Sequence, residues 1–184
     1  MTKTTQSTHD PSSRAQSLVL IWPGTLGHPS EWEMNEEHMF SLVTSFLETV
    51  GEHDGNIVVI ESRWWQFQEG YMRYLIDQKL VECAAKGYAA RKVLDIEDDD
   101  EVQEFDEVIE WRGFGGQRPD LIFREEEALW LSLQPILNKS DVLIAGGWRD
   151  VEYPQNSPID NAVRKILAHC TDVNVSLSKA ILEH

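Results

Sequence analysis

The sequence of 184 residues contains little cysteine, no long apolar run and comparatively few positive charges. Its two cysteines, Cys83 and Cys170, show neither a CxxC pattern nor the spacing of metal ligands, so we predict no disulfide framework and no metal site. No stretch approaches the roughly 18 consecutive apolar residues that a membrane-spanning helix requires. Without a secretory apolar segment near its start, the sequence predicts a cytoplasmic protein that does not contact a membrane.

Positive charge is scarce, since 16 lysines and arginines stand against 32 acidic residues and the formal net charge is −16. Such a field repels phosphate backbones, which excludes a broad nucleic-acid groove. A small-molecule ligand such as a nucleoside or nucleotide is compatible with this charge, because glycine loops and helix N-termini bind phosphate locally. An acidic surface also suits a module that faces a partner protein, and the sequence leaves a homo-oligomer open.

The chain lacks the fingerprints of the common nucleotide cofactors. Neither GxGxxG nor GxxxxGK[ST] occurs, so we predict neither a dinucleotide fold motif nor a P-loop, and we expect no cofactor. The histidines and glutamates between His28 and His38 do not form an HExxH pattern and are interpreted as a helix face. The acidic run at 97–101 is interpreted as a solvated face of an insertion.

Apolar residues nevertheless make up 41% of the chain, and a chain of this length can bury one core without disulfides or metals. Short apolar runs predict strands at 17–22, 57–60, 92–96, 120–123, 141–145 and 173–175. Helical spacing predicts helices at 30–50, 64–86, 102–109, 125–137 and from 157 onward. This alternation predicts an α/β fold: a three-layer sandwich with a mainly parallel, doubly wound sheet of the Rossmann or flavodoxin-like kind. We place the single domain at 17–181, a disordered tail at 1–16 and a purification-tag remnant at 182–184.

Local signals define the expected ends and faces of the helices. Ser30 and Glu33 form a capping box for the first helix, with Gly51 as its C-cap. Gly87 ends the second helix, whose predicted apolar face comprises Phe67, Tyr71, Tyr74, Leu75 and Leu80. The next helix directs inward Leu129, Trp130, Leu133 and Leu137. The last helix has Ser157 as N-cap and Pro158 at its first position, and its expected core face comprises Val163, Ile166 and Leu167.

Two glycine-containing loops mark the expected site. One runs from Pro23 to Ser30 after the first strand, and the other runs from Gly146 to Ser157 after the strand at 141–145. Both lead into the start of a helix, which favours an anion. Because ligands of open parallel sheets bind beyond the carboxyl ends of the strands, we expect the two loops to form one cleft.

These loops resemble parts of the nucleoside 2-deoxyribosyltransferase-like families. The resemblance is carried by Pro-Gly-Thr-Leu-Gly-His-Pro at 23–29 with Asn35 and Phe40, Ser-Asp-Val-Leu-Ile-Ala-Gly-Gly-Trp at 140–148, and Asn-Ser-Pro-Ile-Asp at 156–160. Where those families usually have Gly-Thr-x-x-Glu with a nucleophilic glutamate, this chain has Asp160 and an Asn-Ser pair. The middle of the chain is also longer than in those families.

The resemblance implies a protein that binds a nucleoside or nucleotide and cleaves or transfers at its N-glycosidic bond. It makes Asp160 the nucleophile, with Asp150 or Glu152 orienting the sugar hydroxyls. A structural role for Asp160 stays open, because Ser157 and Asp160 also have the spacing of a capping box.

The same resemblance implies the groups that hold the ligand. Trp22 or Trp148 stacks on the base, and the loop amides near Gly24 and Gly27 hold a phosphate. The second loop contributes Gly146, Gly147 and Ser157 to the predicted ligand-binding residues.

The second half of the chain is also similar to isochorismatase-like cysteine hydrolases, in the segments 120–124, 141–147 and 173–176. Those enzymes use an aspartate, a lysine and a cysteine, where this chain has Pro23-Gly24, Arg124 and Glu152. A carboxylate cannot replace the thiolate nucleophile of that mechanism. This similarity therefore implies a relative without hydrolase activity, and a non-catalytic interaction module is the remaining alternative.

Overall fold

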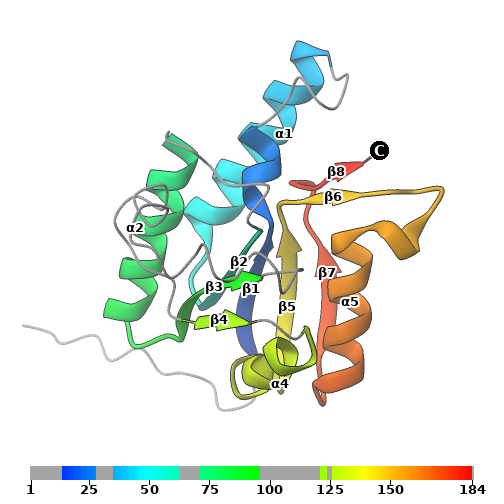
Figure 1. The fold of residues 1–184 in the computed structure, drawn as a ribbon. Helices are drawn as coiled ribbons and strands as arrows, with labels where there is room; N and C mark the ends of the chain where they lie inside the picture. The colour runs from blue at the N-terminus through cyan, green and yellow to red at the C-terminus, as the bar shows by residue number, and fades with distance from the viewer. Residues whose placement is uncertain (1–13, 28–34, 63–70, 96–120, 124–125, 184) are drawn as a thin grey trace, which may run out of the picture.

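The structure, a computed structural model, describes residues 14–27, 35–62, 71–95, 121–123 and 126–183 (Figure 1). Its centre is one sheet of six parallel strands, β1 (Ala15–Ile21), β2 (Asn56–Ser62), β3 (Ala90–Asp95), β4 (Leu121–Phe123), β5 (Ser140–Ala145) and β7 (Asn174–Leu177). Their order across the sheet is β4-β3-β2-β1-β5-β7, and every pairing is parallel. The predicted parallel α/β fold is confirmed.

Helices cover both faces of the sheet and complete a three-layer sandwich (Figure 1). One face packs against α1 (Glu36–Glu52) and α2 (Tyr71–Ala85), and the other against α4 (Glu126–Leu137) and α5 (Pro158–His169). Along β1, Leu18 and Leu20 contribute to the first core, while Val19 and Ile21 contribute to the second. A strand buried on both faces requires consecutive apolar residues, which explains the uninterrupted runs in the sequence.

The end of α1 differs from the prediction that Gly51 is its C-cap. The helix continues through Gly51 to Glu52, with His53 as the C-cap. The Lys79 ammonium group on α2 donates to the carbonyl oxygens of Gly51 at 2.8 Å and His53 at 3.2 Å. A cation is favourable at the negative end of a helix, so Lys79 takes over the role expected of a glycine. At the other end Asn35 is the N-cap, and the predicted capping box at 30–33 lies outside the described residues.

The face that α2 turns inward agrees only in part with the predicted one, and Phe67 lies outside the described residues. Tyr71 and Tyr74 are 67% and 60% exposed, so the expectation that they pack in the core is wrong. Leu80 is buried and Leu75 packs against the core, as predicted, and the other inward positions are held by Arg73, Ile76, Lys79 and Cys83. The spacing of apolar residues did not predict the charged residues of this face. They are buried because they find partners within the fold, as Lys79 does at the end of α1.

The predicted end of α2 at Gly87 is confirmed. Gly87 has a φ of +89°, a conformation that glycine adopts without steric cost. Its N–H donates to the carbonyl of Ala84, and the next N–H, from Tyr88, donates to the carbonyl of Cys83, both at 3.0 Å. This pair of hydrogen bonds is the Schellman arrangement, which satisfies the last carbonyls of a helix.

The two helices on the opposite face agree more closely with the sequence. The inward residues predicted for α4 are all buried, namely Leu129, Trp130, Leu133 and Leu137. In α5, Ser157 is the N-cap and Pro158 the first residue, as predicted. Ile166 is buried and Val163 packs against the core, as predicted, but Leu167 is 56% exposed, and Ile159 and Ala162 complete the buried face.

Strands extend beyond residues 17–181, the predicted range of the domain. Strand β1 begins at Ala15 and pairs with β5 from there on, within the range assigned to the tail. At the other end, β8 (Leu182–Glu183) pairs in parallel with β6 (Trp148–Arg149), and Leu182 is only 2% exposed. Leu182 and Glu183 therefore belong to the fold. None of the described helices has the length and apolar character to span a bilayer.

Candidate functional site

The strand order places the two predicted loops side by side. Strands β2, β3 and β4 follow β1 on one side, and the chain then returns to add β5 and β7 on the other side. The order of winding thus reverses between β1 and β5, and ligands of such sheets bind beyond the carboxyl ends at that reversal. The loops after β1 and β5 begin at this edge, which is the upper one in Figure 1.

At the reversal the two loops touch through their backbones. A β-carbon on Gly147 would lie 2.7 Å from the carbonyl oxygen of Ile21, and one on Gly146 would lie 3.1 Å from the same oxygen and from Cα of Pro23. Both glycines also have positive φ, +77° and +60° for Gly146 and Gly147. The glycine pair is therefore required by the close approach of β1, which is a structural reason for its presence.

The first loop is largely buried. It forms a short 3-10 helix, η1 (Pro23–Gly27), in which Pro23, Gly24, Thr25 and Leu26 are buried. The Thr25 N–H already donates to the carbonyl of Trp22 at 3.0 Å, so this amide is engaged within the turn. The Thr25 hydroxyl, by contrast, is buried without a hydrogen-bond partner.

Asp160, the predicted nucleophile, is held by an arginine. Its carboxylate oxygens accept hydrogen bonds from Nε of Arg149 at 3.2 and 3.0 Å. The hydrogen bond and the negative charge of Asp160 raise the pKa of the Arg149 guanidinium above its usual range. The backbone N–H of Asp160 donates to the Ser157 hydroxyl at 3.0 Å, so half of the capping box is present and the carboxylate points toward β6 instead.

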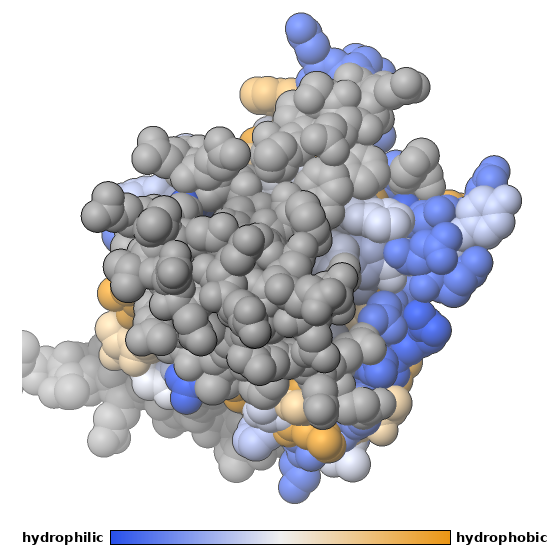
Figure 2. Space-filling view, viewed as in Figure 1, coloured by the Kyte–Doolittle hydropathy of each residue, from blue (hydrophilic) through white to orange (hydrophobic). Residues whose placement is uncertain are grey.

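The other two predicted acidic residues do not join Asp160. The Asp150 carboxylate accepts hydrogen bonds from the backbone N–H groups of Glu152 and Tyr153 at 3.0 and 2.8 Å, and thereby stabilises the turn that follows β6. The side chain of Glu152 is exposed. On the right of Figure 2, where the loop after β6 lies, the residues are mainly hydrophilic.

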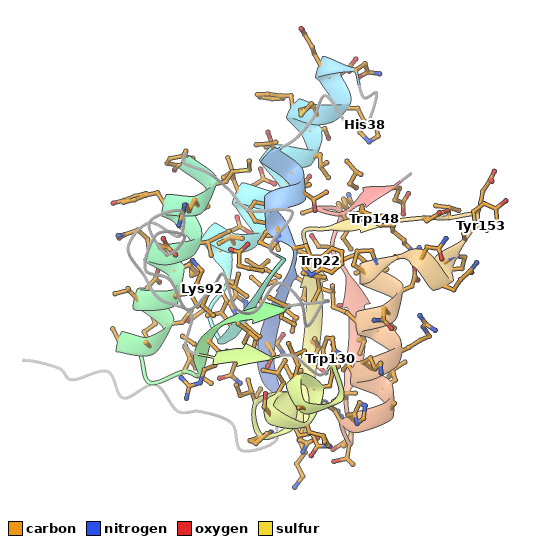
Figure 3. All side chains as sticks on the ribbon, viewed as in Figure 1. Trp22, His38, Lys92, Trp130, Trp148 and Tyr153 are labelled. Carbon is orange, nitrogen blue, oxygen red and sulfur yellow. The ribbon has the colours of Figure 1, made fainter. Side chains whose placement is uncertain are left out.

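The two tryptophans predicted to stack on a base lie against different cores (Figure 3). Trp22, with a φ of +43°, packs against the core under α4 and α5. Trp148 packs against the core under α1 and α2. The two rings therefore pack on opposite faces of the sheet, and stacking of Trp22 or Trp148 on a base stays a prediction.

A groove that sequence reasoning missed lies at the same edge, between α1 and the segment after β7. It has a volume of about 510 Å³ and is lined by His38, Ser41, Leu42, Ser45, Arg149, Leu177, Ser178, Lys179, Ile181 and Glu183. A second hollow of about 370 Å³ shares Ser45, Ser178 and Lys179 with it. The hydroxyl oxygens of Thr49 and Ser178 lie 3.0 Å apart and join the two walls. The signal available in the sequence was a row of hydroxyl residues at four-residue steps on α1, namely Ser41, Ser45 and Thr49.

A buried set of charges lies under α2, at the carboxyl end of β2. Burial raises the pKa of Glu61 to about 7, although the nearby charges of Lys92 and Arg73 oppose the shift. One Glu61 carboxylate oxygen is buried without a hydrogen-bond partner. Lys92 forms an ion pair with Asp77 at 3.3 Å. This cluster was not predicted, because its members come from three elements that only the fold brings together.

Metal and thiol chemistry find no support in the part of the chain that the structure describes. No group of three or more histidine, cysteine, aspartate or glutamate residues in it is arranged to hold a metal ion. Cys83 and Cys170 are buried, free thiols in separate cores, and burial raises the pKa of each. A raised pKa lowers the fraction of reactive thiolate.

Comparison of the chain with protein-family models, with curated proteins and with solved structures gives no match. The function is therefore inferred from the geometry described above.

Proposed function

We propose that the protein binds a nucleotide-sized anionic ligand in the groove between α1 and the segment after β7. The observation that carries the proposal is the lining of this groove at the carboxyl edge of the sheet, where Lys179, Arg149 and Glu183 lie beside the hydroxyl groups of Ser41, Ser45 and Ser178. A volume of about 510 Å³ lies in the range of small-molecule sites.

The lining supports a division of the ligand into three parts. Lys179 supplies positive charge for a phosphate in a chain whose net charge is −16, whereas Arg149 is already paired with Asp160 at 3.0 Å and lies 4.0 Å from Glu183. The hydroxyl groups of Ser41, Ser45 and Ser178 can donate to and accept from sugar hydroxyls. The apolar side chains in the groove, Leu42, Leu177 and Ile181, offer contact area for a base. A nucleoside phosphate is the ligand class that uses all three.

Cleavage or transfer at an N-glycosidic bond receives less support than binding. The Asp160 carboxylate accepts hydrogen bonds from the Arg149 guanidinium. A carboxylate that is paired with a cation is a weaker nucleophile toward an anomeric carbon than a free one. Hydrolase chemistry of the cysteine type receives none, because both thiols are buried. Binding is therefore the function that we propose, and transfer would additionally require the Arg149–Asp160 pair to open.

Calorimetric titration of the protein with nucleoside 5′-monophosphates, and with the matching nucleosides, tests the proposal. A charge-assisted hydrogen bond contributes about 1.5–3 kcal/mol. Lys179→Asn should therefore weaken binding of a monophosphate roughly tenfold or more, and change nucleoside binding little. Lys139→Asn is the matched control, since Lys139 is an exposed lysine at the amino end of β5 with a φ of +58°, which asparagine tolerates. No binding of any monophosphate, or equal weakening by both substitutions, would contradict the proposal.

The same preparations test the predicted transfer chemistry. Chromatography of a nucleoside incubated with the protein measures release of free base. If the protein releases base and Asp160→Asn releases it equally fast, Asp160 is not the nucleophile.

A further inference from the structure

The groove proposed for the ligand continues into the second hollow, and the two share part of their lining. The second hollow has a volume of about 370 Å³, and Ser45, Ser178 and Lys179 line both spaces. Lys179 therefore lies where the groove and the second hollow meet. Its ammonium group has no hydrogen-bond or ion-pair partner among the described residues, so it can bind an anion from either side. A phosphate held by Lys179 thus lies between the two spaces.

Hydrogen bonds between the walls of the second hollow determine which way its hydroxyl groups donate. The Thr49 hydroxyl donates its one proton to the carbonyl oxygen of Ser45 at 2.7 Å. In the hydrogen bond of 3.0 Å between Thr49 and Ser178, the donor is therefore the Ser178 hydroxyl. Both protons are used within the fold, and the oxygen atoms of Thr49 and Ser178 face the hollow as acceptors.

Three further residues of the second hollow offer acceptors. The carboxylates of Glu48 and Glu52, one helical turn apart on α1, can only accept hydrogen bonds. His53 donates through Nε2 to the carbonyl oxygen of Asn56 at 2.7 Å, and burial lowers the pKa of its imidazole. The neutral ring has Nδ1 as an acceptor. This lining fits a group that is rich in donors and has no negative charge, and the hydroxyl groups of a sugar have that chemistry.

The charges around the junction favour a phosphate that is a diester. Lys179 and the Ser45 hydroxyl supply donors there. A phosphate monoester carries nearly two negative charges at neutral pH, because its second pKa is about 6, whereas a diester carries one. Glu48 and Glu52 on one side and Glu183 on the other repel the additional charge of a monoester.

We infer that the ligand is a phosphodiester, with a nucleoside in the groove, its phosphate at Lys179 and a second sugar in the second hollow. The base belongs in the groove because the apolar side chains of Leu42, Leu177 and Ile181 line it. Among the described residues that line the second hollow, Leu143 is the one apolar side chain, which suits a sugar better than a base. A ribodinucleoside monophosphate has this chemistry. The inference rests on the proposed function, from which it takes the place of the nucleoside.

Calorimetric titration of the full chain with ribodinucleoside monophosphates tests the inference. Adenylyl-adenosine, uridylyl-uridine, cytidylyl-cytidine and guanylyl-guanosine are each titrated beside the nucleoside 5′-monophosphate of the same base. The diester of the preferred base should bind about fivefold more tightly than its monophosphate, or better, because its second ribose adds hydrogen bonds in the second hollow.

Removal of both carboxylates from the second hollow separates hydrogen bonding from charge. Glu48→Ala combined with Glu52→Ala should weaken the diester about tenfold. The same variant should leave the monophosphate unchanged or bind it more tightly, because the loss of two negative charges favours any anion. Glu36→Ala combined with Glu37→Ala is the matched control, since both residues are exposed in the first turn of α1 and line neither space. It should leave the affinity for the diester unchanged.

The outcomes distinguish this inference from the proposed function. A diester that binds no more tightly than its monophosphate overturns the inference and leaves the proposed function standing. So does a Glu48→Ala and Glu52→Ala variant that binds the diester as tightly as the wild type or more tightly, since charge alone then governs binding. If neither monophosphates nor diesters bind, or if Lys179→Asn weakens neither, the proposed function fails and the inference fails with it.

Discussion

Glu61 provides the sharpest test of the electrostatics of the fold. Its carboxyl group is fully buried, and burial raises its pKa from 4.5 to about 7, while Lys92 and Arg73 lower it less strongly. The protonated form is therefore favoured in the folded state. The contribution of Glu61 to stability is fully present below about pH 4.5 and is lost as the pH rises through about 7.

The magnitude follows from the two pKa values. Between them the unfolded chain has released a proton that the folded chain retains, so stability falls by about 1.4 kcal/mol per pH unit. Over the interval from about pH 5 to pH 8 the loss is roughly 2.5 kcal/mol. Glu61→Gln keeps the shape of the side chain but cannot ionise. The free energy of unfolding of the wild type minus that of the variant should fall by this amount across the interval.

Urea denaturation followed by circular dichroism at closely spaced pH values measures this difference. Glu82→Gln is the control. Hydrogen bonds from Lys86 and Lys79 hold the pKa of Glu82 at about 2, so both its folded and unfolded values lie below the interval. The corresponding difference for Glu82 should be constant from about pH 5 to pH 8. A flat difference for Glu61 as well would refute the reasoning, since it would mean that Glu61 is ionised in the fold and that its cationic neighbours outweigh burial.

Two further predictions concern the packing at the carboxyl edge. Gly147→Ala should lower the free energy of unfolding by about 2–3 kcal/mol, because the added β-carbon meets the Ile21 carbonyl and the φ of Gly147 is positive. Gly51→Ala is the control in the same urea titration. It should be neutral or stabilising, because Gly51 lies in a helix with open space around it. Leu182→Ala should cost about 2–4 kcal/mol because Leu182 is buried, and an unchanged midpoint would show that β8 does not contribute to the fold.

The strands and the fold class were predictable from the sequence because the sheet is covered on both faces. Residues such as Leu143 and Ile144 lie on opposite faces of β5 and still both contact a core, so the run stays apolar and its length is that of a strand. The meeting of the loops after β1 and β5 was also predictable, because parallel strands with short connections leave few alternatives for the place of a reversal.

The inner face of α2 could not be predicted, because periodicity rests on the assumption that apolar side chains turn inward. Lys79 is buried for its hydrogen bonds to the end of α1, and Lys92 for its ion pair with Asp77. Each of these partners is far away in the sequence or on another element. Spacing within one helix contains no information about them.

The sequence predicted the edge of the sheet at which the groove lies, but none of the predicted site residues lines the groove. Asp160 was recognised as an acid near the carboxyl edge, yet its role depends on Arg149, eleven positions earlier, which lies on the separate strand β6. The groove has one wall from α1 and another from the end of the chain. Such a surface exists only after the two segments have packed together, so local sequence patterns could show at most the hydroxyl row on α1.

The separation of the two cores by the sheet has a practical consequence for spectroscopy. Trp130 is buried in the core under α4 and α5, and Trp148 packs against the core under α1 and α2, so each side of the sheet has its own natural fluorophore (Figure 3). Variants that retain one of these tryptophans and replace the others would report on one layer at a time. Emission spectra recorded during unfolding would then reveal whether the two halves of the sandwich loosen together or in sequence.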